Sequence, residues 1–137
     1  MSKELSEETR STVNRLFECY LKKDLDGLLE VVDVTCDWRF PGSSRVLPWA
    51  GNYRGHEFTR FAEYIETSIE YLTYEPHTIH VAGSLATILS HEECRVKSTG
   101  RVFKNDLIAL ARVENQKLTQ FWEYSDTAAM EAAFEAL

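Results

Sequence analysis

The sequence predicts an α+β fold in which helices pack on one face of a mainly antiparallel, bent sheet. Two patterns predict it. Apolar residues repeat at helical spacing through most of the first 69 positions, whereas strand-like alternation begins near residue 74 and continues to residue 126. Helices followed by a run of consecutive strands are typical of α+β domains. With 137 residues and no internal repeat or polar linker, the chain is expected to form one domain, residues 1–137.

Two helices are expected at the start of the chain. Ser6, followed by Glu7 and Glu8, is predicted to cap the first helix, because acids favour the positive end of a helix dipole. Asp24 is predicted to cap a short second helix. The two apolar stripes are Val13, Leu16, Phe17, Tyr20 and Leu21, and then Leu25, Leu28, Leu29 and Val32.

A strand, a loop and a third helix are expected next. Segment 34–40 alternates and ends at Pro41-Gly42, which predicts a strand. Segment 41–55 is rich in Gly, Pro and Ser and is predicted to be a loop, although it carries two large aromatic residues, Trp49 and Tyr53. The residues expected on one face of the strand are Val34, Cys36, Trp38 and Phe40, and the stripe of the third helix is Phe58, Phe61, Ala62, Ile65 and Ile69.

Four consecutive strands, 74–83, 85–100, 101–115 and 117–126, and a closing helix, 127–137, complete the expected order. The third of these strands is apolar on both faces. One face carries Leu107, Ala109, Ala111 and Val113, and the other carries Asp106, Ile108 and Leu110. Antiparallel sheets with one free face normally alternate apolar and polar residues. The second face is therefore expected to be covered by another copy of the chain, in a homodimer formed through the sheet.

Composition excludes several classes of function. A formal net charge of −7 argues against nucleic acid and anionic membrane surfaces as partners. The first ten residues lack the apolar segment of a signal peptide, and no apolar run approaches a membrane span, so a cytoplasmic location is expected. The widely spaced Cys19, Cys36 and Cys94 are interpreted as reduced thiols. No metal-binding or nucleotide-binding motif occurs, and neither a metal nor an organic cofactor is expected.

Four stretches resemble one protein family in their order and spacing. They are KKDLDGLLEVVDVTCDWRFPG (22–42), LPWAGNYRGHEFTRF (47–61), TGRVFKND (99–106) and NQKLTQFWEYSDTAAM (115–130). Together they are similar to the nuclear transport factor 2-like superfamily, and within it to the SnoaL-like and ketosteroid-isomerase-like proteins. The resemblance implies a cone, in which helices pack into a curved sheet around an apolar pocket, and often a dimer. The same fold serves isomerases, cyclases, epoxide hydrolases, dehydratases and non-enzymatic binders.

The resemblance carries over to individual residues only in part. The general base and the oxyanion-hole tyrosine of ketosteroid isomerases would fall at Phe40 and near Leu16, which are both apolar. Their second acid would match Asp106. The acid in the final strand of limonene epoxide hydrolases would match Glu123 in FWEYSD, and their Arg-x-Asp pair would fall at His91-x-Glu93. SnoaL-type cyclases use a pocket aspartate, a role that Asp106 or Glu123 could take.

Asp106, Glu123 and His91 are therefore the candidate catalytic residues. A carboxyl group among aromatic residues is desolvated, so its pKa rises toward neutrality and it can act as a general acid or base. Each candidate also has an ordinary structural interpretation. Asp106 could reach solvent or pair with Lys104, and Glu123 could form an ion pair at the pocket rim. His91 could belong to a solvated strand face with Glu93, Arg95 and Lys97.

Two functions remain open from the sequence. The first is a cofactor-independent acid/base enzyme, of isomerase, cyclase or hydrolase type, acting on a small hydrophobic molecule. The second is a non-catalytic module of the same fold that binds a small molecule or dimerises. The residues expected to shape the ligand pocket are Trp38, Phe40, Trp49, Tyr53, Tyr64 and Trp122.

Overall fold

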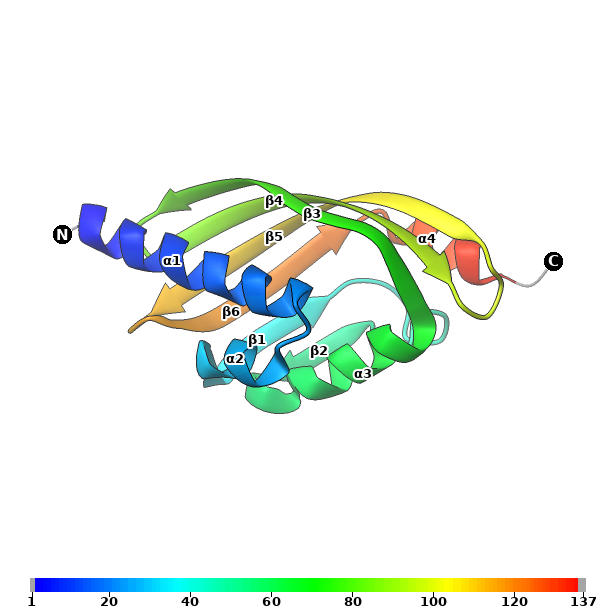
Figure 1. Ribbon diagram of the computed structural model, residues 1–137, viewed down its shortest axis with the longest axis horizontal. Helices are drawn as coiled ribbons and strands as arrows, with labels where there is room; N and C mark the ends of the chain where they lie inside the picture. Colours follow the sequence, from blue (N-terminus) through cyan, green and yellow to red (C-terminus); the bar gives the residue numbers. More distant parts are fainter. Residues whose placement is uncertain (1, 136–137) are drawn as a thin grey trace.

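The computed structural model describes residues 2–135 and has the α+β fold that the sequence predicts (Figure 1). Two helices, two strands, a short 3₁₀ turn and a third helix precede four long strands in a row, and a last helix follows them. The elements are α1 (Ser2–Leu21), α2 (Leu25–Glu30), β1 (Val32–Phe40), β2 (Gly51–Arg54), η1 (Gly55–Glu57), α3 (Phe58–Ser68), β3 (Ile69–Ala82), β4 (Leu85–Val96), β5 (Val102–Glu114), β6 (Lys117–Ser125) and α4 (Thr127–Phe134).

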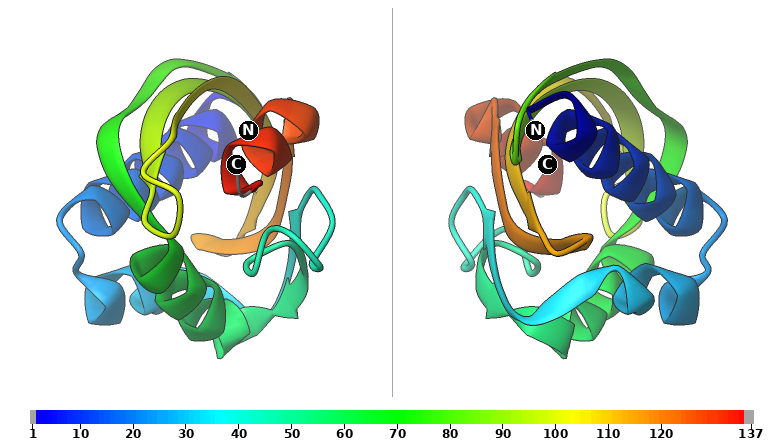
Figure 2. Two further views of the ribbon diagram at one scale, coloured as in Figure 1. Left: turned by 90° about the vertical axis from the view of Figure 1, so that its right-hand side faces the viewer. Right: turned by 90° about the vertical axis from the view of Figure 1, so that its left-hand side faces the viewer.

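The six strands form one sheet in the order β2-β1-β6-β5-β4-β3. All neighbours are antiparallel except β1 and β6, which run parallel, so the sheet is mainly antiparallel as expected. Figure 2 shows the sheet end-on, bent into a curved wall that partly encircles the helices. Helix α1 lies along the inner, concave side, and α2 and α3 lie below it beside β1 and β2. Among the helices within residues 2–135, none combines the length and apolar character needed to cross a bilayer.

The start of α1 corrects one expectation. The helix begins at Ser2, so Ser6 does not cap it. Instead the Ser6 hydroxyl accepts a 2.9 Å hydrogen bond from the backbone N–H of Gly83, and the Thr9 hydroxyl donates to the Gly83 carbonyl at 2.7 Å. These contacts fix α1 to the turn between β3 and β4. The cap predicted for α2 is confirmed, because the Asp24 carboxylate accepts a hydrogen bond from the N–H of Gly27 at 3.0 Å.

Four further features differ from expectation. Val34 was expected on the buried face of β1, but it is 70% exposed because the pairing of β1 with β6 shifts register between Val32 and Asp37. Strand β2 lies inside the segment expected to be a loop, and β3 begins at Ile69, which was expected in the third helix. Helix α4 ends at Phe134, and residues 136–137 of the expected closing helix lie outside the described residues.

A cluster of aromatic residues joins the sheet to the helices. Trp38 of β1 is fully buried, and its indole N–H donates a 2.9 Å hydrogen bond to the carbonyl of Gly55. Phe40 stacks on Phe61 of α3 with 3.8 Å between ring centroids. Gly55 has a left-handed backbone, with φ of +55°, and a Cβ there would collide with the backbone carbonyl of Val34. The absence of a side chain at this position therefore allows η1 to hold the Trp38 ring against the core.

We predict that Gly55→Ala lowers the free energy of unfolding by about 2–4 kcal/mol, because it adds both a left-handed strain and a backbone clash. Gly100→Ala is the matched control. Gly100 is also left-handed, with φ of +76°, but a Cβ there meets nothing within 4 Å. The control should lose only about 1 kcal/mol. Urea denaturation measures both values, and equal losses would contradict the role given to Gly55.

Candidate active site

A cavity lies between the concave face of the sheet and the helices. It contains about 570 Å³ of space not filled by atoms, part of it open to solvent. The space that a water molecule can enter is about 40 Å³, enough for a few waters. Most of its walls are aromatic. The lining residues are Leu16, Phe17, Tyr20, Leu28, Trp38, Phe40, Trp49, Phe58, Phe61, Ile65, Ile69, Tyr71, Tyr74, Glu92, Phe121, Glu123 and Met130.

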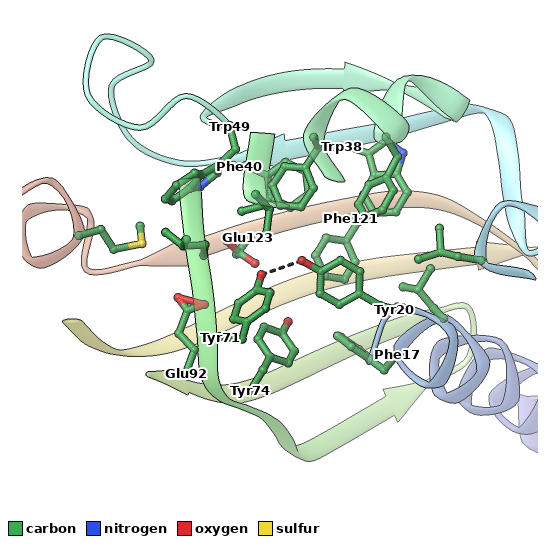
Figure 3. Close-up of a pocket in the computed structure, with 17 residues that line it drawn as sticks. Phe17, Tyr20, Trp38, Phe40, Trp49, Tyr71, Tyr74, Glu92, Phe121 and Glu123 are labelled. Atoms are coloured by element: carbon green, nitrogen blue, oxygen red, sulfur yellow. Dashed lines mark hydrogen bonds between the residues drawn. The ribbon is translucent and has the colours of Figure 1, made fainter. Parts of the chain in front are cut away.

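Glu123 enters this cavity from β6 (Figure 3). A register shift between β5 and β6 leaves Thr119 as an extra residue, so that Leu118 and Phe121 both face inward. Glu123 lies two residues after Phe121, so its side chain also faces inward. It pairs with Ala109 of β5, whose small side chain leaves room beside the carboxyl group. Burial, and to a lesser extent the nearby Glu92 carboxyl, raise the pKa of Glu123 to about 8.

Glu92 enters the same cavity from β4, and it is only 6% exposed. Burial raises its pKa to about 7, while a hydrogen bond from the Cys94 thiol and the nearby His91 act weakly in the opposite direction. Figure 3 shows both glutamates pointing into the space beside Tyr71. The two acids interact, so their two protons are lost in coupled steps near neutral pH. The pair can therefore hold one proton and one charge at the same time.

Three tyrosines complete the polar part of the cavity. The hydroxyls of Tyr20 and Tyr71 are hydrogen-bonded at 2.7 Å, across the gap between α1 and β3 (Figure 3). Tyr74 packs edge-on against both rings. Burial raises the pKa of all three phenols above their ordinary range, so they remain protonated near neutrality. They can donate hydrogen bonds to a bound molecule but cannot serve as bases.

Asp106 and His91 require a correction, because they lie outside the cavity. Asp106 is on the outer face of the sheet, with a side chain 89% exposed, and it accepts a 3.0 Å contact from His91 Nδ1. The Nε2 atom of His91 lies 3.2 Å from the Glu93 carboxylate. The hydrogen bonds to these two carboxylates raise the pKa of His91. This outer group matches the solvated strand face that was the ordinary interpretation of His91.

The expected pocket aromatics divide into two groups. Trp38, Phe40 and Trp49 line the cavity. Tyr53, Tyr64 and Trp122 do not. Tyr53 is buried behind Phe40, its hydroxyl bonded to the Trp49 carbonyl at 2.8 Å, and Tyr64 is 37% exposed.

Trp122 faces the opposite side of the sheet from its neighbour Glu123, because successive residues of a strand point to opposite faces. The Arg39 guanidinium carbon lies 3.9 Å from the centroid of the Trp122 ring, and the Trp122 indole N–H donates a 3.2 Å hydrogen bond to the Asp37 carboxylate.

Glu92 is the candidate site residue that the sequence does not single out. The signal was present in β4, where the residues in phase with Glu92 are Ala86, Ile88, Ser90, Cys94 and Val96, nearly all apolar. The His91-x-Glu93 pair lies at the alternate positions of the strand, on the outer face. In β5 the outer face carries Ile108 and Leu110 and so has the pattern of a core face, although Asn105 rather than Asp106 points inward and is buried.

Within residues 2–135, no cluster of three or more His, Cys, Asp or Glu side chains is placed to hold a metal ion. The site therefore consists of two carboxyl groups and three phenols in an aromatic enclosure.

Comparison with known proteins places the chain in a family. The model of the SnoaL-like domain matches residues 13–121. The chain belongs to the SnoaL-like domain family. No curated protein sequence matches it. Among solved structures, an NTF2-like protein from Burkholderia xenovorans LB400 shares 30% identity, with a TM-score of 0.87 over 95% of this chain and 98% of the other.

Two more distant structures share the fold alone. TerC, co-crystallised with polyporic acid, is 16% identical, with a TM-score of 0.80 over 94% of this chain and 99% of its own. An LEH-like epoxide hydrolase from M. tuberculosis is 11% identical, with a TM-score of 0.69 over 94% of this chain and 90% of its own. In this SnoaL-like chain the two positions expected to align with ketosteroid isomerase residues, Leu16 and Phe40, both line the cavity and bring no proton donor.

We predict that stability falls with rising pH because of Glu123. Its pKa is raised from 4.5 to about 8 on folding, so the native state keeps a proton that the unfolded chain releases. The free energy of unfolding should therefore fall between about pH 4.5 and about pH 8, by at most about 1.4 kcal/mol per pH unit for this proton. Urea denaturation at several pH values measures the slope.

Glu123→Gln should flatten that slope, although Glu92 will leave part of it. Glu114→Gln removes an exposed acid at the end of β5 and should leave the slope unchanged. An unaltered slope in Glu123→Gln would show that the Glu123 carboxyl titrates in the same range in the folded and unfolded states.

Proposed function

We propose that the protein is a cofactor-independent acid/base enzyme, of isomerase, cyclase or hydrolase type, that acts on a small hydrophobic molecule in the cavity. One observation carries the proposal: two carboxyl groups from different strands share an aromatic enclosure, with pKa values of about 7 and about 8. A general acid or base works best when its pKa lies near the working pH.

Glu123 and Glu92 would divide the roles. Over the range in which the pair holds a single proton, the ionised member can remove a proton from a bound molecule, and the protonated member can donate one elsewhere on it. The phenols of Tyr20 and Tyr71 stay protonated, and they can hydrogen-bond an oxygen on which negative charge develops. These groups suit enolisation, dehydration, aldol-type cyclisation or attack by an activated water. Asp106 and His91 take no part, because they lie on the outer face.

The passive alternative is a module that binds a small apolar molecule without reaction. Leu16 and Phe40 favour this alternative, because they stand at positions where isomerase relatives would need reactive groups. The two glutamates oppose it. A buried carboxyl group costs free energy unless it is paired, and a cavity that only held an apolar ligand would be more stable with Gln or Leu at these positions. TerC, whose structure has a similar fold and was co-crystallised with polyporic acid, supports a small organic ligand for this fold. The LEH-like epoxide hydrolase supports a catalytic use of the same fold.

The cysteines agree with the cytoplasmic location that we propose. Cys19, Cys36 and Cys94 are all buried free thiols, which suits a reducing compartment.

We predict that the protein accelerates the base-promoted ring opening of 5-nitrobenzisoxazole, a flat apolar probe that reacts when a carboxylate removes its ring C–H proton. The nitrophenolate product is followed by its absorbance. The rate should rise with pH through the range near 7–8 in which the two glutamates ionise. Glu123→Gln or Glu92→Gln should lower it by about 10²- to 10⁴-fold, the usual contribution of a general base.

Glu114→Gln is the control for this assay, because it removes a surface acid away from the cavity. A wild-type rate equal to that of acetate buffer, or full activity in both cavity variants, would reject the acid/base proposal and favour the passive module.

We also propose that two copies of the chain pair through the outer face of the sheet. The helices leave that face uncovered (Figure 2). Ile108, Leu110 and Tyr124 lie there, 46%, 38% and 51% exposed. The registers place Ile108 directly between Leu89 and Tyr124, so the exposed apolar residues form one continuous patch. A two-fold interface uses the same patch on both subunits, and a continuous exposed apolar patch is suited to it.

We predict a mass of two 15.8 kDa chains by light scattering, and a single-chain mass for Ile108→Arg, which places a charge at the centre of the patch. Val34→Arg is the matched control, since Val34 is also an exposed apolar strand residue, 70% exposed, but lies on β1 away from the patch. A single-chain mass for the wild type, or an intact dimer in Ile108→Arg, would reject this interface.

A further inference from the structure

The charges around the cavity are of one sign. Glu92 and Glu123 face it, and no Lys, Arg or His of residues 2–135 is among its lining residues. Neither carboxylate accepts a hydrogen bond from a backbone N–H within that described range, and Glu123 receives no side-chain hydrogen bond there either. Ionised carboxylates inside a protein are normally paired with a cation or hydrogen-bonded. Within residues 2–135 this pair has no cationic partner in the cavity wall, and the Cys94 thiol is a weak hydrogen-bond donor to Glu92 alone.

The aromatic walls act in the same direction as the acids. The face of an aromatic ring carries partial negative charge and attracts cations, most strongly for Trp and Tyr. Trp38, Trp49, Tyr20, Tyr71 and Tyr74 all border the cavity. An anionic ligand would be repelled by rings and carboxylates alike. A neutral ligand would leave any ionised carboxylate uncompensated, whereas an organic cation would interact favourably with both.

We propose that the natural ligand of the cavity is an organic cation: an ammonium group attached to an apolar ring or chain. The ammonium would lie beside Glu92 and Glu123, near the Tyr71 ring, and the apolar part would lie against Trp38 and Phe40. Because the free space of the cavity holds only a few waters, the lining side chains would move apart to admit the ligand. This inference rests on the proposed function, because it assigns a substrate class to the same cavity. It adds that proton transfer would occur on a molecule held through a basic nitrogen.

A second hollow adjoins the cavity on the side of the tyrosines. A wide groove bordered by α1, α2, α3 and β3 shares Tyr20, Tyr71 and Tyr74 with the cavity wall. The hydrogen-bonded pair of Tyr20 and Tyr71 therefore stands between the groove and the two acids. Glu66 and Glu70 lie in the groove, held by Lys23 and Arg95.

In the absence of a cation, protons take its place on the two glutamates, so cation binding must compete with protonation. The other titratable groups around the pair are Tyr20 from α1, Tyr71 and Tyr74 from β3, and Cys94 from β4. Burial raises the pKa of each of them, so they stay neutral near pH 7. His91 lies behind Glu92 on the outer face and acts on it only weakly. The two glutamates therefore dominate the pH dependence of binding.

The test compares three probes of similar size and different charge: benzylammonium, benzyl alcohol and benzoate. Binding is measured by the shifts of tryptophan indole resonances in NMR titrations. Benzylammonium should bind most tightly and benzoate least. Its affinity should be at least about tenfold higher near pH 8 than near pH 6, because fewer protons compete at the higher pH. Binding should release protons, which calorimetry in buffers of different ionisation enthalpy detects.

Glu92→Gln and Glu123→Gln should each weaken benzylammonium binding by about tenfold or more and reduce its pH dependence. Asp106→Asn is the matched control, because it removes one negative charge from the outer face and should leave binding unchanged. Circular dichroism establishes that the variants are folded.

Two results would overturn the inference. If benzyl alcohol binds more tightly than benzylammonium and loses affinity in the Gln variants, the proposal of a cationic ligand is wrong while the acid/base proposal stands. If no probe binds, or if both Gln variants bind every probe as the wild type does, the proposal of a cationic ligand is wrong and the carboxyl pair loses its proposed function as well.

Discussion

The cavity depends on one constraint: two carboxyl groups are held in an aromatic enclosure to which residues 2–135 contribute no basic side chain. In water a glutamate is ionised at neutral pH, whereas here burial shifts the balance toward the protonated form. The shift represents free energy that the rest of the fold must offset, because each pKa unit corresponds to about 1.4 kcal/mol. The stacked rings and the continuous buried face of the sheet supply that stability. A flatter sheet would expose both acids to water and remove the effect.

Several local features keep the two acids facing the cavity. The extra residue Thr119 shifts the alternation of β6, so that Phe121 and Glu123 face inward as Leu118 does. Asn105 of β5 lies across from Glu92, and its side chain accepts a 3.1 Å hydrogen bond from the N–H of Asp126. Asp126 in turn caps α4, which contributes Met130 to the cavity wall. Asn105 thus ties β5, which pairs with the strand that carries Glu92, to the start of the helix that contributes Met130.

The sequence predicted the fold well, because element order and period depend on local patterns. It predicted the site less well, for a reason visible in β4 and β5. The alternation of side chains along a strand shows which residues share a face, but it does not show which face is buried. In β5 both faces carry apolar residues, so the sequence does not distinguish the face of Asp106 from the face that the curved sheet buries. In β6 a bulge at Thr119 determines which residues around Glu123 face inward, and no residue type there predicts a bulge. The exposed Val34 follows from a register shift of the same kind.

The placement of the acids also bears on how this SnoaL-like chain uses its fold. The resemblance places isomerase chemistry on the first helix and first strand, and those positions hold Leu16 and Phe40 here. The polar groups are found instead on β4 and β6, with phenols from α1 and β3 facing them. Both arrangements direct reactive groups into the same enclosed volume from different walls. A bound molecule would therefore meet its acid and base from the sheet rather than from the helix side, and its orientation would differ from that in an isomerase. Under this proposal the apolar side chains of Leu16 and Phe40 would contact the unreactive part of the ligand and keep water away from the carboxyl pair.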